Sequence, residues 1–564
     1  PDDEGIWRSL EDVLLDCNRS ALLRGRLEVQ HLTAARLDIP RLPQSEAGDD
    51  LPEAEATPFS LPDLPVSVDI ADFAVDQITL GAPLLGEDAE LRVQATARLD
   101  DAGVTLDIDA TRTEAKRGGF VIKGELTRED NLLDLLVRLS EGEDGIAARL
   151  MSIPDRPAVD LSIQGTGPLD DLVTDLQLST DGVERLGGEV TLSVQPSRRN
   201  DSQPDRRIQA DIGGDVTALL APRFRAFFGE DVRLRLDTLL ESNGAVEVSA
   251  FDLTAQSAQI AGKLTLNADK WPSLIDITGR IASPDGTPVL LPLGGEAKTV
   301  EAMDLRVDYN AEDGDVLDAD FDITALIMPG LELASTQLGL DGTLKGNVGA
   351  VGAFDGDVVF DASGLTLTDP ALSEAVGTRV SGSATVVYIE GEPTRINGLT
   401  LTGADYGLTG NAAISGVEAS LRTTLDVALE ASDLSRFSAL AGREMDGRTA
   451  LALKGSVTPL DGAFDLTAEG STDDLKLGIA QADAVLAGRT TVSMQAKRDE
   501  TGTFLRDLIL RNAALNLTGR AALRTDNSDV EADFRLEDIA LVLPQYEGPV
   551  TVSATATQDS AGWR

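Results

Sequence analysis

A short cassette of alternating positions recurs along the whole chain: a hydrophobic residue, any residue, glycine, any residue, and a second hydrophobic residue. The intervening positions are mostly polar. Such alternation is typical of a β-strand with one apolar and one solvated face. Glycine on the apolar face commonly marks a bulge, a bend or a close backbone approach. Copies of the cassette begin at Leu23, Ile122, Leu186, Ile260, Ile277, Leu340, Val380, Leu408, Leu453 and Leu517.

In three places a second apolar pair precedes the cassette at the same distance. Turn formers and small polar residues lie between the pair and the cassette, as in Gly403-Ala404-Asp405. The repeat unit is therefore predicted to be a hairpin, made of a strand, a short turn and a glycine-containing strand. The three matching segments are Phe251 to Leu266, Leu399 to Ile414 and Leu508 to Leu523.

The pattern divides the chain into three stretches. Residues 1–43 begin the repetitive β region, and residues 44–65 form an acidic, proline-rich segment that is predicted to be an exposed loop. Residues 66–564 are predicted to continue the repetitive β region. Two breaks in the strand pattern, near 217–228 and 435–441, predict short helices packed on or capping the sheet, with Thr217 and Ser435 as N-caps.

Composition makes the expected core aliphatic. Apolar residues are 42% of the chain, but aromatic residues are only 4%, and stacked repeats can bury aliphatic side chains without large aromatic anchors. A long sheet with one aliphatic face must bury that face against something. It can close on itself as a solenoid, pack against helices, or stay partly open to receive a ligand.

The charge balance excludes one class of partner. Acidic residues outnumber basic residues 96 to 48, for a formal net charge of −48, so nucleic acid is not an expected partner. Asp318, Asp320 and Asp322 alternate with apolar residues and are predicted to lie on a solvated outer face. A calcium site lacks support, because these residues have neither the glycine nor the distal glutamate of an EF-hand loop.

Catalytic chemistry has little support in this sequence. His31 is the only histidine and Cys17 the only cysteine, which weighs against catalytic triads, histidine-rich metal sites and an intrachain disulfide. A surface position is expected for His31. The sequence therefore predicts a protein that is not an enzyme, with no catalytic residue, metal or cofactor. A carboxylate-pair glycosidase remains an alternative, although sugar-binding aromatic platforms are scarce.

Phospholipid acyl chains are the natural ligand for a continuous aliphatic track. Each buried CH₂ contributes roughly 0.8 kcal/mol, so a lipid with about thirty methylenes faces on the order of 20 kcal/mol on entering water. A protein that moves such lipids needs an unbroken apolar path. The inward cassette positions predicted to line that groove are Leu27, Leu126, Val190, Leu264, Leu344, Ile414, Val457 and Leu523.

The N-terminal residues also resemble a known family. The stretch from Leu14 to Val29, continued from Ala35 to Pro43, is similar to the N-terminal portion of the TamB family. These proteins are inner-membrane-anchored subunits of the translocation and assembly module of Gram-negative bacteria, within the AsmA-like group. The segments Gly165 to Leu172, Asp181 to Gly188 and Asp433 to Ser435 also fit. Cys17 departs from the pattern, because a tryptophan is expected there.

The resemblance implies a fold, a location and partners. The implied fold class is mainly β, an elongated repetitive antiparallel sheet curled into a U-shaped groove, or β-taco, with a few short helices. The implied protein is periplasmic and anchored in the inner membrane through a segment outside this chain. A C-terminal region, also outside this chain, is expected to meet an outer-membrane TamA-like protein. The family's roles are phospholipid transport toward the outer membrane and the assembly and secretion of autotransporters and outer-membrane proteins.

A secreted β-solenoid adhesin or passenger with a closed core is the alternative from another class. It predicts regular rungs of fixed length and ladders of asparagine or threonine. Here the spacing varies, and the two helical breaks interrupt the pattern. The sequence alone does not separate lipid transfer from protein assembly.

Overall fold

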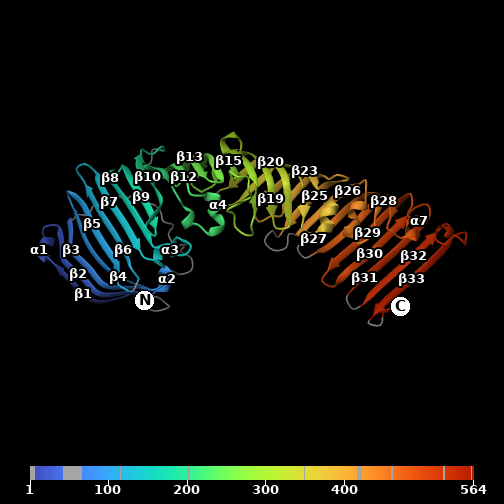
Figure 1. The fold of residues 1–564 in the computed structure, drawn as a ribbon, viewed down its shortest axis with the longest axis horizontal. Coiled ribbons are helices and arrows are strands. Elements are labelled where there is room, and N and C mark those ends of the chain that lie inside the picture. The colour runs from blue at the N-terminus through green and yellow to red at the C-terminus, as the bar shows by residue number, and fades with distance from the viewer. Residues whose placement is uncertain are drawn as a thin grey trace. The chain divides into compact units, whose positions relative to one another are not determined.

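The computed structural model describes residues 7–41, 67–114, 116–199, 203–347, 350–415, 422–458, 462–524, 527–559 and 562–564. The loop predicted at 44–65 lies outside the described residues. The chain forms two compact units, Pro1–Lys270 and Trp271–Arg564 (Figure 1). No feature of the repeat pattern indicates a division at this position.

The predicted fold class is confirmed, because the protein is mainly β, with an open repetitive sheet and a few short helices. In the N-terminal unit the strands are β1 (Ser9–Cys17), β2 (Arg26–Ile39), β3 (Ser67–Leu80), β4 (Ala89–Asp100), β5 (Gly103–Arg112), β6 (Gly118–Thr127), β7 (Leu132–Glu141), β8 (Val159–Pro168), β9 (Asp171–Thr180), β10 (Val183–Gln195), β11 (Asp205–Gly214), β12 (Val232–Leu240), β13 (Val246–Ala255) and β14 (Ala258–Leu266). Its helices are α1 (Arg19–Leu22), α2 (Ala82–Leu85), α3 (Ile146–Leu150), the 3₁₀ turns η1 (Thr217–Leu219) and η2 (Pro222–Phe224), and α4 (Arg225–Phe228).

The C-terminal unit continues the same design. Its strands are β15 (Pro272–Ala282), β16 (Val289–Leu290), β17 (Thr299–Val300), β18 (Ala302–Asn310), β19 (Val316–Met328), β20 (Leu331–Asn347), β21 (Ala350–Ser363), β22 (Thr366–Leu367), β23 (Arg379–Ile389), β24 (Thr394–Thr402), β25 (Tyr406–Ser415), β26 (Arg422–Ala431), β27 (Asp446–Thr458), β28 (Ala463–Lys476), β29 (Arg489–Asp499), β30 (Gly502–Arg511), β31 (Leu515–Leu523), β32 (Ser528–Leu536), β33 (Val550–Asp559) and β34 (Gly562–Trp563). Its helices are η3 (Ala311–Asp313), α5 (Pro370–Val376), η4 (Ser435–Phe437), α6 (Ser438–Ala441), α7 (Ala480–Val485) and η5 (Ile539–Leu541).

Most neighbouring strands pair antiparallel, as their short connections require. The exception among the described strands is β2 with β3, which pair parallel, with Leu27 opposite Val68 and Ile39 opposite Leu80. A parallel pair needs a long connection, and residues 40–66 provide one. The sheet is therefore mixed, whereas the resemblance implies an antiparallel sheet.

Strict alternation gives the sheet of each unit two different faces. In β5, Leu106 and Ile108 lie opposite Gly124 and Ile122 of β6, while Asp107 lies opposite Lys123. We call the face that carries the aliphatic residues the apolar face, and the other the polar face. Because the side-chain period of a strand is two residues, this assignment holds along each strand except where a bulge inserts an extra residue.

The first cassette copy does not form the predicted hairpin. Asn18 accepts a hydrogen bond from the backbone N–H of Ser20 and begins the short helix α1. Leu23 consequently lies in the turn after α1 with 90% of its surface exposed, and β2 starts only at Arg26. The other nine cassettes lie within strands, in β6, β10, β14, β15, β20, β23, β25, β27 and β31.

The three segments that match in sequence form hairpins with the same irregularity. In β13–β14, β24–β25 and β30–β31 the upstream strand gains one residue, immediately before the residue that faces the cassette glycine. The bulge therefore lies in the partner strand and not at the glycine itself. Bulges increase local twist and bend a strand. The residues opposite each other are Phe251 and Gly262, Leu399 and Gly410, and Leu508 and Gly519.

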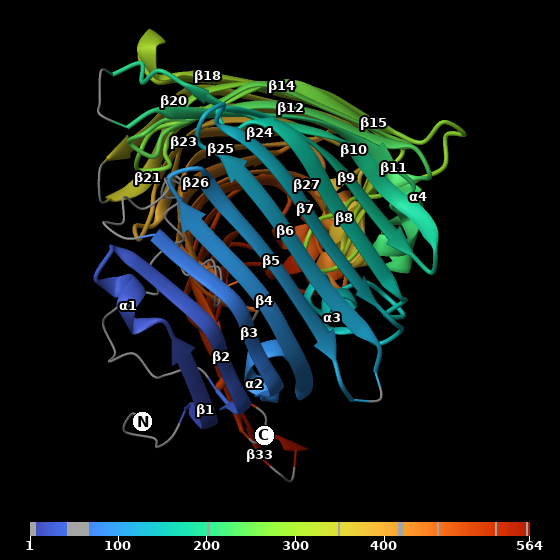
Figure 2. The ribbon, with the colours of Figure 1, turned by 90° about the vertical axis from the view of Figure 1, so that its left-hand side faces the viewer.

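The two edges of each sheet, where consecutive strands connect, are built differently. At one edge, which we call the helical edge, longer connections carry α2, α3 and α4 in the N-terminal unit (Figure 2). In the C-terminal unit the helical edge carries α5, α6 and α7. At the opposite edge, the turn edge, most described connections are short, such as the turn between Asp100 and Gly103. Many helical insertions follow a run of four strands, for example β4 to β7 before α3 and β8 to β11 before α4.

Short helices occupy both predicted breaks in the strand pattern, but their N-terminal hydrogen bonds come from other residues. Asp215 accepts hydrogen bonds from the backbone N–H of Thr217 at 3.0 Å and from its hydroxyl. Asp433 accepts from the backbone N–H of Ser435 at 2.8 Å. The prediction of Thr217 and Ser435 as N-caps was therefore wrong, because each is the first residue of its 3₁₀ turn and the N-cap residues are Val216 and Leu434.

The cassette glycine of β25 allows a test of whether a cassette position requires glycine for its backbone conformation and close packing. Gly410 has φ of 148°, and a Cβ there would lie 2.2 Å from the carbonyl oxygen of Asp426. Gly410→Ala is expected to lower the free energy of unfolding by about 1–3 kcal/mol, measured by urea denaturation. Gly407 lies in the same strand, and a Cβ there would meet its nearest atom at 3.8 Å. Gly407→Ala should change stability by less than about 0.5 kcal/mol; equal losses from the two variants would contradict this account.

Candidate functional site

The apolar face is incompletely covered in both units. Leu192 on β10 and Phe120 on β6 point from the apolar face, yet 40% and 36% of their surfaces are exposed. Large partly exposed aliphatic surfaces of this kind usually meet a ligand or partner, so this face is the candidate functional site.

Within the N-terminal unit, the predicted groove residues share the apolar face. Leu27 and Leu126 belong to one cross-strand row that runs through Val68, Leu99 and Val104. Val190 and Leu264 lie on the same face, on β10 and β14. Leu126 is only 4% exposed, so it contributes to the core and is poorly placed to contact a ligand.

Within the C-terminal unit, the predicted residues also share one face. Ile414, Val457 and Leu523 lie in a single row near the turn edge. Leu344, on β20, lies opposite Phe354. The structure thus places all eight predicted residues on apolar faces, and it places most of them toward the turn edge and away from the centre of the face.

The centre of the apolar face across β26–β32 consists of three cross-strand rows with no polar side chain. Sequence reasoning did not single out these residues, because strand register decides which of them align. The first row is Leu425, Gly455, Leu466, Ala496, Leu505, Ala521 and Val530. The second is Val427, Leu453, Ala468, Met494, Leu508, Gly519 and Ala532, and the third is Leu429, Leu451, Gly470, Val492, Leu510, Leu517 and Phe534.

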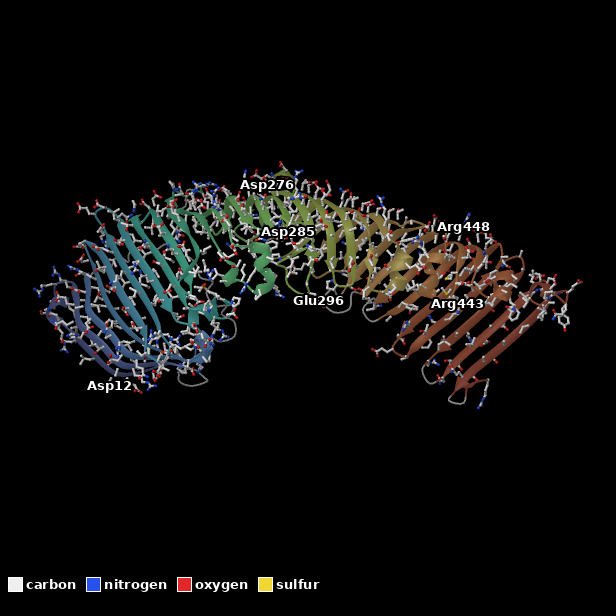
Figure 3. All side chains as sticks on the ribbon, in the orientation of Figure 1. Asp12, Asp276, Asp285, Glu296, Arg443 and Arg448 are labelled. Carbon is white, nitrogen blue, oxygen red and sulfur yellow. The ribbon has the colours of Figure 1, made fainter. Side chains whose placement is uncertain are left out.

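Carboxylates gather on the polar face instead. Asp276 projects from the polar face of β15 (Figure 3). It begins a row of five aspartates that lie directly opposite one another on neighbouring strands. Like charges in such positions repel and destabilise a sheet. The row is Asp276, Asp308, Asp318, Asp341 and Asp357.

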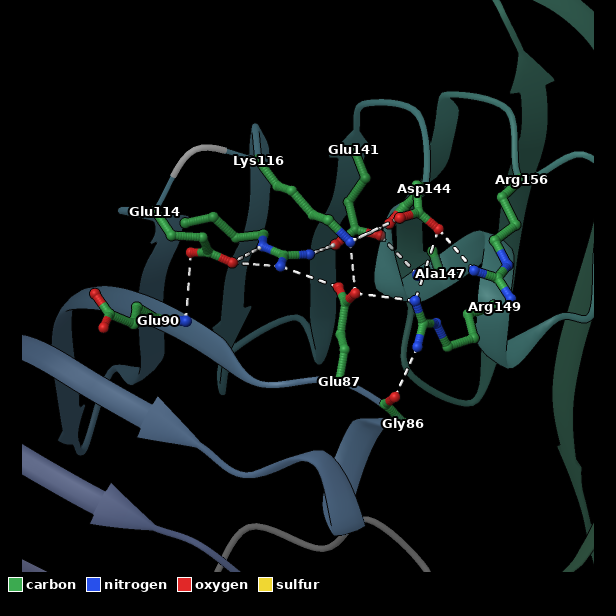
Figure 4. A network of polar contacts seen from close by, with 11 residues as sticks. Gly86, Glu87, Glu90, Glu114, Lys116, Glu141, Asp144, Ala147, Arg149 and Arg156 are labelled. Atoms are coloured by element: carbon green, nitrogen blue, oxygen red, sulfur yellow. Dashed lines mark hydrogen bonds and ion pairs between the residues drawn. The ribbon is translucent and has the colours of Figure 1, made fainter.

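A buried ionic network holds the helical edge of the N-terminal unit together (Figure 4). Arg112, with 2% of its side chain exposed, contacts Glu87 at 3.1 Å, Glu141 at 3.5 Å, and Glu114. Glu141 also accepts a hydrogen bond at 2.6 Å from the backbone N–H of Ala147, in the first turn of α3. The network therefore joins the connections on both sides of β4–β7.

Direct contacts between α2 and α3 strengthen this connection. Arg149 of α3 donates to the carbonyl oxygen of Gly86 at 2.6 Å and pairs with Glu87 at 3.0 Å. In a flat sheet the outer strands of β4–β7 would lie about 15 Å apart. Because Arg112 and Glu141 lie on the apolar face, the contacts cross that face and make it concave at the helical edge.

An apolar pocket lies beneath α3 at this edge. Its volume is about 270 Å³, and it is lined by side chains of the apolar face together with residues of α3. Phe120, Leu139 and Leu150 contribute to the wall. The neighbouring core cluster of Ala147, Ala148, Ile153, Val159 and Leu178 is buried. The part of the apolar face that α3 covers is therefore continuous with the part that remains exposed.

The network shifts the pKa values of its members. Burial alone would raise the pKa of Glu87, but hydrogen bonds from Lys116 and Arg112 outweigh this and lower it. The pKa of Asp144 falls to about 2 because Arg156 and Lys116 donate hydrogen bonds to its carboxylate. These carboxylates are therefore charged at neutral pH, and they hold the network together by pairing with the cationic side chains.

The C-terminal unit joins its helical insertions with different residues. Arg436 of η4 donates to the carbonyl oxygen of Ala375 in α5 at 3.3 Å and pairs with Asp405. The hydroxyl of Tyr406 donates to the carbonyl oxygen of Val376 at 3.1 Å. Here too, contacts connect the insertions on both sides of four strands, β23 to β26.

The remaining candidate residues take ordinary positions. His31 is exposed, and its Nδ1 lies 2.9 Å from the carboxylate of Asp72. Cys17 is a free, half-buried cysteine at the end of β1. Across the described ranges, no group of three or more His, Cys, Asp or Glu side chains is arranged to hold a metal ion. None of the helices in those ranges is long and apolar enough to cross a membrane.

Comparisons with known proteins do not assign a family. No protein-family model matches the chain, and neither a curated protein nor a solved structure matches it. The function must therefore be argued from the apolar face and its charge pattern.

The helical-edge network predicts an acid sensitivity. The folded-state pKa of Asp144, about 2, lies below the ordinary aspartate value of 3.8, so Asp144 stabilises the folded state above pH 3.8 and loses this effect as pH falls toward 2. We expect the melting temperature of the wild type to fall more steeply between pH 4 and pH 2 than that of Asp144→Asn. Parallel curves for the two proteins would show that Asp144 does not stabilise the unit.

Repulsion between the carboxylates of the aspartate row predicts that the effect of a substitution on stability depends on salt concentration. Asp318→Asn removes repulsion from Asp308 and Asp341 and should raise the free energy of unfolding by about 0.5–1 kcal/mol at low ionic strength. The gain should shrink as salt screens the charges. Asp426→Asn is the control, because Asp426 pairs with Lys454 at 3.1 Å. Denaturant titrations at low and high salt measure both effects; a control that is stabilised as much as Asp318→Asn would contradict the prediction.

Proposed function

We propose that this protein guides phospholipids along its apolar face, with their acyl chains against the aliphatic rows. The observation that carries the proposal is the segregation of charge. The centre of the face across β26–β32 holds only aliphatic residues, Met494, Phe534 and glycines, while the aspartate row occupies the polar face of β15–β21. Acyl chains need a path without charged groups, because burying an unpaired charge in hydrocarbon is costly.

The three cross-strand rows together form an aliphatic stripe, and the width of this stripe suits an acyl chain. The three rows are two residues apart along each strand, so the outer rows are about 14 Å apart at about 3.4 Å per residue. The hydrocarbon of one bilayer leaflet, half of a core of about 30 Å, is about 15 Å thick. A lipid tail laid along a strand would therefore fill the stripe from one row to the last.

The setting of this proposal comes from the resemblance to the TamB family. It implies a periplasmic protein anchored in the inner membrane, which passes phospholipids toward the outer membrane. A TamA-like outer-membrane protein would be its partner, and assembly or secretion of outer-membrane proteins would be supported alongside. No catalytic residue, cofactor or nucleic acid enters the proposal.

The open sheet of each unit favours this function over a closed-core adhesin. A closed solenoid would bury residues such as Leu192 on the apolar face, whereas 40% of the surface of Leu192 is exposed. The helical edges cover one strip of the face and leave the rest accessible. This arrangement leaves room for a ligand that slides along the face.

Site-specific photocrosslinking tests the proposal with matched pairs. A photoreactive residue at Leu192 on the apolar face is compared with one at Val173 on the polar face, which is equally exposed at 40%. In the C-terminal unit Leu523, 45% exposed, is compared with Val359, 55% exposed on the polar face. We expect phospholipid adducts at Leu192 and Leu523 and few at Val173 and Val359, measured by mass spectrometry after irradiation in cells.

Two other outcomes would change the conclusion. Equal or absent lipid labelling at both members of each pair would reject a lipid path on the apolar face. Adducts to unfolded outer-membrane proteins, in place of lipids, at Leu192 and Leu523 would favour a scaffold for protein assembly.

A further inference from the structure

The row of the apolar face nearest the turn edge differs from the three aliphatic rows beside it. It runs without interruption across ten strands, β24 to β33, because each member lies directly opposite the next. Polar residues make up six of its ten positions. The row, which we call the turn-edge row, is Thr394, Ile414, Thr423, Val457, Phe464, Arg498, Thr503, Leu523, Ser528 and Gln558.

Arg498 places a positive charge on this face. Across β23–β33, no other register-paired position of the apolar face in the described residues is charged. Its side chain is exposed and lies between Phe464 and Thr503. The next residue along the strand on the same face is Ala496, which belongs to the first aliphatic row.

The sign of this charge is unexpected for such an acidic protein. Acidic residues outnumber basic residues 96 to 48 in the chain, yet this face keeps an arginine and excludes carboxylates. Chance placement would favour an aspartate or glutamate. Arg498 therefore places a positive charge beside the aliphatic rows, against the charge balance of the chain.

The N-terminal unit independently carries the same combination. Arg206 lies on the apolar face next to the turn edge, opposite Val194 and Leu240. The other charged residues at register-paired apolar-face positions of β4–β14, within the described ranges, are Arg112 and Glu141, which neutralise each other at the helical edge. In both units the cationic group of the open face therefore lies at the turn edge.

We propose that the turn-edge row binds the headgroup of the lipid and that Arg498 makes the face selective for anionic phospholipids. This inference rests on the proposed lipid function. A guanidinium can donate two parallel hydrogen bonds to a phosphate. The hydroxyl of Thr503, which is exposed and lies directly opposite Arg498, adds a donor for the phosphate and glycerol oxygens.

The same geometry sets the direction of the lipid. With the phosphate at the turn-edge row, the tails lie along the strands, across the three aliphatic rows, and end near the helical edge. At the helical edge the helical insertions cover the face, and the side chains of Thr449, Thr472 and Thr490 are buried beneath them. A headgroup at the helical edge would have to displace that covered strip.

The test compares the headgroups that the purified protein takes up. The full chain is incubated with vesicles of equal parts phosphatidylglycerol and phosphatidylethanolamine, and the retained lipids are quantified by mass spectrometry. We expect the wild type to enrich phosphatidylglycerol about threefold, as one exposed ion pair allows. Arg498→Gln should bring the ratio close to one with the total lipid unchanged, and Arg498→Lys should keep part of the preference.

Arg489 provides the matched control, because it lies on the polar face of the same strand, opposite Asp473. Arg489→Gln changes the net charge equally and should leave the ratio at the wild-type value. An equal loss in both variants, or a ratio near one in the wild type, would overturn the headgroup inference while leaving the lipid path intact. Failure of the wild type to retain any lipid would instead overturn the proposed function itself.

Discussion

Strand register is the constraint on which the rest of this structure depends. Side chains alternate between faces with a period of two, so a slip of one residue would move every aliphatic side chain to the polar face. It would also bring carboxylates such as Asp426 and Glu469 onto the apolar face. Recurrent bulges opposite the cassette glycines twist the hairpins without disturbing the rest of the register. The continuous aliphatic rows exist because this register is maintained from strand to strand.

The helical edge gives a sheet with few large core residues its cohesion. Sheets of this kind have no second layer against which to pack, so their buried contacts concentrate where the insertions fold over the strand ends. The N-terminal unit uses Arg112 and its carboxylates for this purpose. The C-terminal unit uses Arg436 and Tyr406. Different chemistry thus produces the same result in each unit: one covered strip beside a face that remains open.

Charge segregation connects this architecture to the proposed function. A sheet that only had to remain soluble could carry charges on either face of its exposed rows. Here the aliphatic stripe is free of charge, the aspartates lie on the polar face, and arginine appears where the stripe meets the turn edge. This is the distribution that an amphipathic ligand with an anionic head and hydrocarbon tails would require.

The sequence by itself determined the mainly β fold, the hairpin repeat and the face on which each cassette residue lies, because alternation is a local property of a strand. The sequence already indicated that Arg498 lies on the apolar face, because it alternates in step with Thr490, Val492, Met494 and Ala496. Only the tertiary structure decided which residues align across strands, that β2 and β3 pair parallel, and that Leu23 lies in a turn. The contacts of Arg112 and Arg149 with Glu87 likewise depend on residues 25 and 62 positions apart. Such pairings follow from register and from the folding of distant insertions over the sheet, and no local pattern specifies them.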